Sequence, residues 1–129
     1  VLRWNSTGIT IAGTGVYGTG SNQLKTPWDL AFDLSNTLYV IDRYNNRVQK
    51  FLMGSTNGST ILGQANGISG SNLSDLSEPT GIQVDLNGNV YVVDKNNSRI
   101  LFLEKGTLSG RIIAGNGKIN FFQEFKKSL

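Results

Sequence analysis

The chain has neither cysteine nor histidine, and only two prolines occur in its 129 residues. Without cysteine there is no disulfide, no thiolate nucleophile and no cysteine metal ligand. Without histidine, the commonest zinc ligand and the usual general base are both missing. Carboxylates, lysine, tyrosine, serine and threonine remain, and no pair of carboxylates is visibly placed for acid–base work. The composition therefore favours a protein that is not an enzyme and predicts no metal site and no cofactor.

Long apolar runs and strong charge of one sign are missing as well. No apolar stretch approaches the roughly 18 residues that a membrane-spanning helix needs, so no membrane span is expected. The first residues, 1–5, lack the charged and apolar regions of a signal peptide, and nothing indicates a compartment. The 12 basic and 9 acidic residues are scattered and give a net charge of +3. Such a surface is compatible with an anionic partner without requiring one.

What the chain does contain is a gapless repeat with an offset of 52 residues, from Pro27 to Pro79. Residues 27–51 read PWDLAFDLSNTLYVIDRYNNRVQKF, and residues 79–103 read PTGIQVDLNGNVYVVDKNNSRILFL. Eight positions are identical, which composition alone does not explain: Pro27/Pro79, Asp33/Asp85, Leu34/Leu86, Tyr39/Tyr91, Val40/Val92, Asp42/Asp94, Asn45/Asn97 and Arg47/Arg99.

Each copy divides into four short strands separated by turn residues, in a chain with 16 glycines. Asn87–Gly88 is a strong hairpin signal between the first two strands, because both residues tolerate positive φ. The second strand of each copy is a continuous apolar run, which predicts burial on both faces. The first copy predicts strands at 28–32, 38–41, 48–51 and 60–62, and the second at 80–84, 90–93, 100–103 and 111–114.

The two ends of the chain fit the repeat less completely. Residues 1–4 resemble the third strand and residues 9–13 the fourth, so residues 1–13 are expected to form half a unit. The tail, 116–129, is off-pattern. It is either a helix with Phe121, Phe122 and Phe125 on one face, covering an open edge, or disordered.

Four antiparallel strands per unit at this period are typical of β-propeller blades. Residues 79–85, 88–94 and 97–100 resemble the NHL repeat, and the first copy departs from it at Asp29 and at Ser35–Asn36. The resemblance implies an all-β fold of consecutive four-stranded antiparallel blades in an incomplete NHL-type propeller. The expected organisation is a propeller segment over 1–115, with a half blade at 1–13, blades at 27–63 and 79–115, and the tail. Because NHL propellers close with more blades, self-association through open blade edges is possible.

Two charged pairs recur at fixed spacing. Arg47 follows Asp42 by five residues, and Arg99 follows Asp94 by the same interval. Recurrence in each blade favours a structural role, in which each arginine pairs with the aspartate across a corner, over an anion contact.

Two other motifs have simpler explanations than ligand binding. Asp85, Asn87 and Asn89 match the start of a calcium loop, but Asn96 stands where the bidentate carboxylate is required, so a hairpin turn explains them. The GxGxxG string at 13–18 has no helical pattern after it and is read as a loop.

In propellers, the corners between strands two and three lie on the same face as the loops between blades, and this face commonly binds ligands. Here the candidate binding residues on that face are Tyr17, Lys25, Arg43, Tyr44, Lys95 and Asn96. Cations beside an aromatic suit phosphates and bases, and they suit the rim of a protein interface equally well.

Three functions follow from these observations. The leading one is a non-catalytic scaffold that binds a protein or glycan partner through its loops. The second is single-stranded RNA binding on the weakly basic face, as in some NHL propellers. The third is a fragment of an NHL-type lyase; because such enzymes hold their metal with histidines, the metal site would then lie in blades outside this chain.

Overall fold

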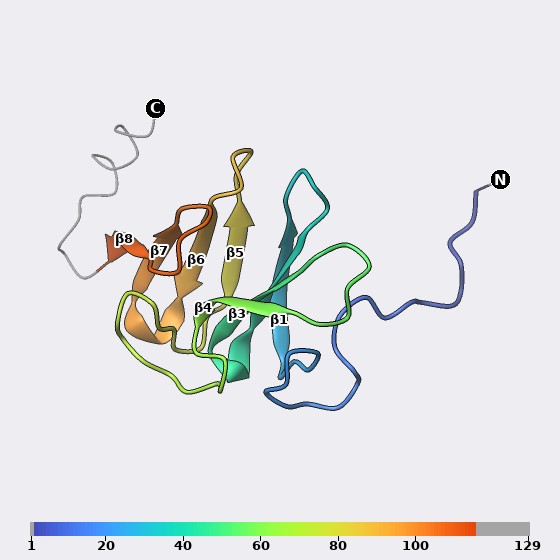
Figure 1. Ribbon diagram of the computed structural model, residues 1–129, viewed down its shortest axis with the longest axis horizontal. Coiled ribbons are helices and arrows are strands. Elements are labelled where there is room, and N and C mark those ends of the chain that lie inside the picture. Colours follow the sequence, from blue (N-terminus) through green and yellow to red (C-terminus); the bar gives the residue numbers. More distant parts are fainter. Residues whose placement is uncertain (1, 116–129) are drawn as a thin grey trace.

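The structure, a computed structural model, describes residues 2–115 and contains two four-stranded antiparallel sheets (Figure 1). The first blade consists of β1 (Pro27–Phe32), β2 (Leu38–Asp42), β3 (Arg47–Phe51) and β4 (Ser59–Gly63). The second blade consists of β5 (Gly81–Val84), β6 (Val90–Asp94), β7 (Arg99–Leu103) and β8 (Arg111–Gly115). In both sheets the strands are hydrogen-bonded in chain order. The all-β class and the consecutive four-stranded blades are thereby confirmed.

The hairpin between the first two strands has the same construction in both blades. In the first blade, Asp33 Oδ1 accepts the N–H groups of Ser35 at 2.8 Å and Thr37 at 2.9 Å. The residue between them, Asn36, has φ 59°, and its counterpart Gly88 has φ 82°. Asparagine and glycine are the residues that adopt this left-handed backbone most readily, so the turn forms at the same place in both copies.

The larger hydrophobic cluster lies between the two blades. Successive β2 side chains point to opposite sides of the sheet, so Tyr39 and Ile41 face the second blade while Leu38 and Val40 face away from it. On the second blade, Val90 and Val92 of β6 turn toward the first. The shared cluster comprises Tyr39, Ile41, Val48, Leu62, Leu76, Ile82, Val90, Val92, Leu101 and Leu103. The two blades are thus two layers that share one core.

Burial of the second strand on both faces is correct for β2 and wrong for β6. Every residue of β2 is buried, whereas Val93 of β6 is 40% exposed. Its counterpart in the first blade, Ile41, is 0% exposed because the second blade covers it. Within the described residues, nothing covers the corresponding face of the second blade.

Polar groups also join the blades. Ile82 donates its N–H to Asp29 Oδ2 at 3.0 Å, and Gly63 donates its N–H to the Ser74 carbonyl at 2.8 Å. Asp29 is one of the positions at which the first copy departs from the NHL pattern, and here its carboxylate accepts a hydrogen bond from the next blade. The packing of the blades therefore includes directed hydrogen bonds as well as apolar contact.

The segment before the first blade forms no strand over residues 2–26. The two strands expected within 1–13 are therefore not observed, because the described chain offers them no sheet to join. Residues 2–11 are exposed and extend away from the blades (Figure 1), and Ala12 packs against the cluster of Leu38, Val40 and Phe51. Assignment of 1–13 to a half blade stays a prediction. The expectations for the tail, 116–129, lie outside the described residues.

No helix among residues 2–115 has the length and apolar character needed to cross a membrane.

Candidate functional site

The corner between the second and third strands is a single turn of 3-10 helix in each blade. These turns are η1 (Arg43–Asn45) and η2 (Lys95–Asn97). Each ends in a left-handed residue, Asn46 with φ 51° and Ser98 with φ 50°. The corner therefore reverses the chain within four residues and leaves Tyr44, Lys95 and Asn96 exposed.

In the first blade, three buried side chains stabilise this corner. Asp42 Oδ2 accepts hydrogen bonds from Arg47 Nε at 2.7 Å and from Asn45 Nδ2 at 2.9 Å. The other carboxylate oxygen, Oδ1, accepts the N–H of Lys25 at 2.6 Å. The buried aspartate is thus paired with a cation and with neutral donors on both oxygens, as a buried charge requires.

The guanidinium of Arg47 extends this network into the loop before the first blade. Its Nη1 donates to the carbonyl of Thr19 at 2.9 Å, and its Nη2 donates to those of Gly20 and Gln23, both at 3.0 Å. Nη1 also reaches the carbonyl of Ala65 at 2.7 Å, in the loop after the blade. One arginine therefore fixes the loops that enter and leave the blade.

The second blade repeats these contacts with the same geometry. Arg99 Nε lies 2.8 Å from Asp94 Oδ2, and Asn97 Nδ2 donates to the same oxygen at 2.8 Å. The Arg99 guanidinium donates to the carbonyls of Ser71, Asn72 and Asp75, at 2.9, 2.7 and 3.1 Å. The structure thus places each predicted aspartate and arginine in contact. The shared asparagine was visible as an identity between the copies, but its bond to the aspartate was not predicted.

Outside this buried network, the corner of the first blade carries two exposed aromatic rings in contact with a largely buried cation. Arg43 Cζ lies 4.1 Å from the centre of the Trp28 ring and 5.0 Å from that of Tyr44. Both distances are within the range of cation–π attraction. Trp28, at the start of β1, is 55% exposed and was missed from the sequence. Its position directly after Pro27 could have indicated this placement, because Pro27 pairs with Asp42, the residue before the corner.

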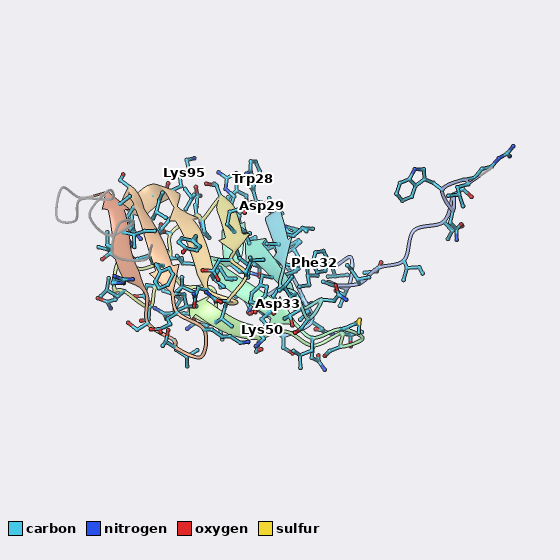
Figure 2. All side chains as sticks on the ribbon, turned by 90° about the horizontal axis from the view of Figure 1, so that it is seen from above. Trp28, Asp29, Phe32, Asp33, Lys50 and Lys95 are labelled. Atoms are coloured by element: carbon cyan, nitrogen blue, oxygen red, sulfur yellow. The ribbon has the colours of Figure 1, made fainter. Side chains whose placement is uncertain are left out.

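Two of the other predicted residues, Tyr17 and Lys25, form a pair linked to Tyr44 through the backbone, and two stand apart from the stack. Lys25 Nζ lies 5.6 Å from the Tyr17 ring, and the Lys25 carbonyl accepts the N–H of Tyr44 at 3.1 Å. Lys95 and Asn96 occupy the corresponding corner of the second blade and are exposed. In Figure 2, Lys95 and Trp28 lie along the same margin of the molecule, opposite Lys50. We call Tyr17, Lys25, Trp28, Arg43 and Tyr44 the corner face.

The charge of the corner face is moderated by a carboxylate. Arg43 Nη2 lies 3.6 Å from Glu78 Oε2, in the loop that leads into the second blade. Arg43 Nε is buried and has no hydrogen-bond partner among residues 2–115. Lys25 is therefore the cation of the corner face for which no carboxylate contact is observed among the described residues.

The opposite end of the blades holds a hollow of about 290 Å³ that includes Asp33, Tyr39, Lys50 and Lys105 in its lining. Burial, together with a hydrogen bond to Asp33 Oδ2 at 3.1 Å, raises the pKa of Tyr39 to about 12. Burial alone would raise the pKa of Asp33, but the hydrogen bonds that its carboxylate accepts outweigh this effect and lower it. The carboxylate of Asp33 and the hydroxyl of Tyr39 are thus hydrogen-bonded to each other, and Asp33 is also bonded to the hairpin turn.

The corresponding hairpin of the second blade accounts for the calcium-like residues. Asp85 Oδ1 accepts the N–H groups of Asn87 and Asn89, both at 2.9 Å. Within residues 2–115, no three histidine, cysteine, aspartate or glutamate side chains are grouped so as to hold a metal ion.

Comparison with known proteins agrees with the repeat and the blades. The NHL repeat model matches residues 24–51 and 76–101. The chain is 31% identical over 102 residues to NHL repeat-containing protein 2 of Bos taurus, a match that covers 75% of this chain and 14% of that protein. The chain thus spans about one seventh of the length of this relative. Both matched segments begin in the loop before a blade and include its Asp–Asn–Arg corner, which places the chain in the NHL-repeat family.

Proposed function

We propose that the chain is a non-catalytic NHL-repeat scaffold that binds a protein or glycan partner through its corner face. The observation that carries this proposal is the exposure of the Trp28 and Tyr44 rings, which lie on the surface in contact with a largely buried Arg43 side chain. Exposed aromatic rings beside arginine are the residues that most often dominate binding energy at protein interfaces.

Rigidity of the corner supports the same proposal. The residues next to Arg43 and Tyr44 in the chain, Asp42 and Asn45, are both buried and hydrogen-bonded to each other. A binding side chain that is fixed before its partner arrives loses less conformational entropy on binding. The Asp–Asn–Arg corner thus holds the exposed Tyr44 ring and the largely buried Arg43 side chain in place.

Single-stranded RNA is the second candidate, favoured by the cations beside aromatic rings. Stacking of bases on Trp28 and Tyr44 would suit single-stranded RNA. Against it, Glu78 lies beside Arg43 and Asp29 lies next to Trp28 in the chain, so the corner face offers few cations without an adjacent carboxylate. Affinity for RNA depends on phosphate neutralisation, and this distribution of charge favours a protein or glycan partner. The lyase alternative has no supporting observation in this part of the chain.

Trp28 provides the reporter for a direct test. The chain has two tryptophans, and replacing the other one, Trp4→Phe, leaves Trp28 as the sole indole emitter. This single-tryptophan variant is titrated with three probes: soluble oligosaccharides, peptides selected from a displayed random library, and a mixed-sequence single-stranded RNA at low salt. We expect a saturable change in Trp28 emission with an oligosaccharide or a selected peptide.

Two further variants locate the binding. Tyr44→Ala in the single-tryptophan background should weaken binding about tenfold or more, the loss usual for an aromatic hot spot. Leu86→Ala is the matched control, since Leu86 is exposed in the hairpin turn at the opposite end. If Tyr44→Ala and Leu86→Ala bind equally well, the partner sits elsewhere. If only RNA binds, with affinity falling steeply as salt rises, the second candidate replaces the first.

A further inference from the structure

One face of the second blade, which nothing within residues 2–115 covers, repeats the surface on which that blade itself sits. A shallow hollow on this face is lined by Val93, Ile100, Ala114 and Gly115, with Lys95 and Ser98 at its rim. Each of these six residues lies 52 positions after a residue of the first blade, in the register that the repeat defines: Ile41, Val48, Leu62, Gly63, Arg43 and Asn46. We call this hollow the socket.

In the first blade, the equivalent of the socket is filled by the second blade. Leu76 is fully buried there, in the cluster that includes Ile41, Val48 and Leu62. The rim is closed by Glu78, which donates its N–H to Asn46 Oδ1 at 2.8 Å and pairs with Arg43. The filling element is thus the loop before β5 together with β5 itself.

The first blade carries the counterpart of that filling element on its own outer side. Leu30 of β1 is 54% exposed, whereas its counterpart Ile82 of β5 is 3% exposed because it packs against the first blade. Phe32 of β1 is also exposed. The chain therefore carries a second copy of each surface of its internal interface. One copy lies on the outer side of the second blade, and the other lies on the outer side of the first blade. We call Leu24–Pro27 together with Leu30 and Phe32 the plug.

The backbone of the plug already has the conformation that docking requires. Thr26 has φ 54°, and Glu78, at the same repeat position, has φ 46°. Lys25 donates its N–H to Asp42 at 2.6 Å, just as Ser77 donates to Asp94 at 2.8 Å. A preformed segment needs little ordering when it binds.

We propose that a second copy of this chain docks head to tail, with its plug in the socket of the first copy. A second copy is the expected partner because its plug and socket match the two surfaces that already pack together within the chain. The internal interface also predicts which residues come into contact and the direction in which the incoming strand runs. The two surfaces are different, so the interface is heterologous and leaves one plug and one socket free in a dimer. This association uses neither Trp28 nor Tyr44, and Lys25 is the one residue that the plug shares with the corner face.

Three differences make this contact weaker than the internal one. Gly81 stands where Asp29 accepts the N–H of Ile82, and Ser98 replaces Asn46 at the rim. Ala12 packs with Leu24 in the same cluster and must move aside for the incoming Ala114. The association is therefore expected to depend on concentration.

Two charge substitutions test the proposal, because each blocks one surface and leaves the other intact. Val93→Asp places a carboxylate in the socket, and Leu30→Asp places one on the plug. Both positions are exposed in the single chain, so both variants are expected to fold, which thermal unfolding checks. In sedimentation equilibrium the unaltered chain should gain mass with concentration, and each variant alone should associate at least tenfold more weakly.

The mixture of the two variants is decisive. Val93→Asp retains its plug and Leu30→Asp retains its socket, so an equimolar mixture should form a one-to-one dimer and nothing larger. A symmetric interface, or pairing of strand edges, would give no such rescue and would overturn the proposal. So would an unaltered chain that stays monomeric over the whole concentration range.

One further variant should strengthen the contact. Ser98→Asn restores the side-chain acceptor that Asn46 provides to Glu78 in the internal interface. A single added hydrogen bond of ordinary strength should tighten self-association about fivefold. The double variant Val93→Asp/Ser98→Asn is the control and should associate as weakly as Val93→Asp alone, because its socket is blocked. Tightening in both variants would show that Ser98→Asn acts elsewhere.

Discussion

The first and second blades share their strands, hairpins and corners, yet they differ in which side chains are buried. Tyr39 and Ile41 of β2 lie in the core between the blades, whereas Tyr91 and Val93 at the same positions of β6 are partly or largely exposed. The sequence at these positions is nearly the same. What differs is the neighbour, because only the first blade has another blade on that side within the described residues.

The corners, by contrast, are buried in both blades. Asp42 and Asp94 are each 0% exposed and bonded to the same set of partners. All these partners come from the blade itself or from the loop that precedes it. Hydrogen bonds formed within one repeat and its preceding loop are thus the same in both blades. Burial that depends on the next repeat differs between them. Four changes would break or sharpen this comparison.

The largest effect is expected from the corner arginines. Arg47→Ala or Arg99→Ala leaves a buried aspartate without its cation, which should lower the free energy of unfolding by about 3–5 kcal/mol. Arg47→Ala should cost more, because Arg47 also bonds to the Ala65 carbonyl. Urea unfolding measures both, with exposed Lys95→Ala as the control. An unchanged free energy of unfolding for Arg99→Ala would show that the network is not structural.

Gly63→Ala should have the next largest effect. Gly63 has φ 86°, and an added Cβ would collide with the Asn46 carbonyl oxygen and lie 2.7 Å from Arg47 Cα. The left-handed backbone alone costs about 1–2 kcal/mol, and the collision adds to it. Gly54→Ala is the matched control, with φ 80° and nothing within 4 Å of the added Cβ. Equal losses of stability in the two variants would show that the collision relaxes freely.

Asp29→Ala tests the polar contact between the blades. Removing the carboxylate leaves the Ile82 N–H without its acceptor, at a cost of about 1 kcal/mol. Asp29→Asn keeps an acceptor oxygen and should retain most of the stability. Hydrogen exchange of the Ile82 amide follows this directly and should be faster only in Asp29→Ala. Equal exchange in both variants would mean that the N–H is protected by burial and not by this bond.

The smallest effect concerns the two tyrosines at high pH. The folded chain raises the pKa of Tyr39 from 10.0 to about 12, first through burial and then through its hydrogen bond to Asp33, so it holds the proton more tightly than the unfolded chain does. The resulting stabilisation is complete below pH 10 and is lost as the pH rises toward 12. Burial also raises the pKa of Tyr91, whose ring is less buried.

Absorbance of ionised tyrosine, followed during an alkaline titration, distinguishes these two residues. We expect Tyr39 to ionise after Tyr91, and Tyr39→Phe should remove the later transition and delay alkaline unfolding. Tyr91→Phe is the comparison variant and should remove an earlier transition. Removal of the same transition by both substitutions would mean that the two environments are equivalent.

Much of the fold follows from local sequence signals. The eight strands begin and end within one residue of their predicted bounds, because alternation, proline and turn residues act over short distances. The pairing of Asp42 with Arg47 was likewise predicted from its spacing. The candidate site was predicted less completely, since Trp28 precedes Arg43 by 15 residues. Only the pairing of β1 with β2 brings the two side chains together.

By itself, the sequence determined the repeat, the four strands of each blade and the buried pair at each corner, because each of these needs only residues of one unit and the loop before it. The tertiary structure alone decided which face of each blade is covered, that Asp29 and Asn46 serve as acceptors for the next blade, and that residues 2–26 form no strand. The physical reason is that alternation along a strand shows which side chains share a face, whereas burial of that face depends on what packs against it.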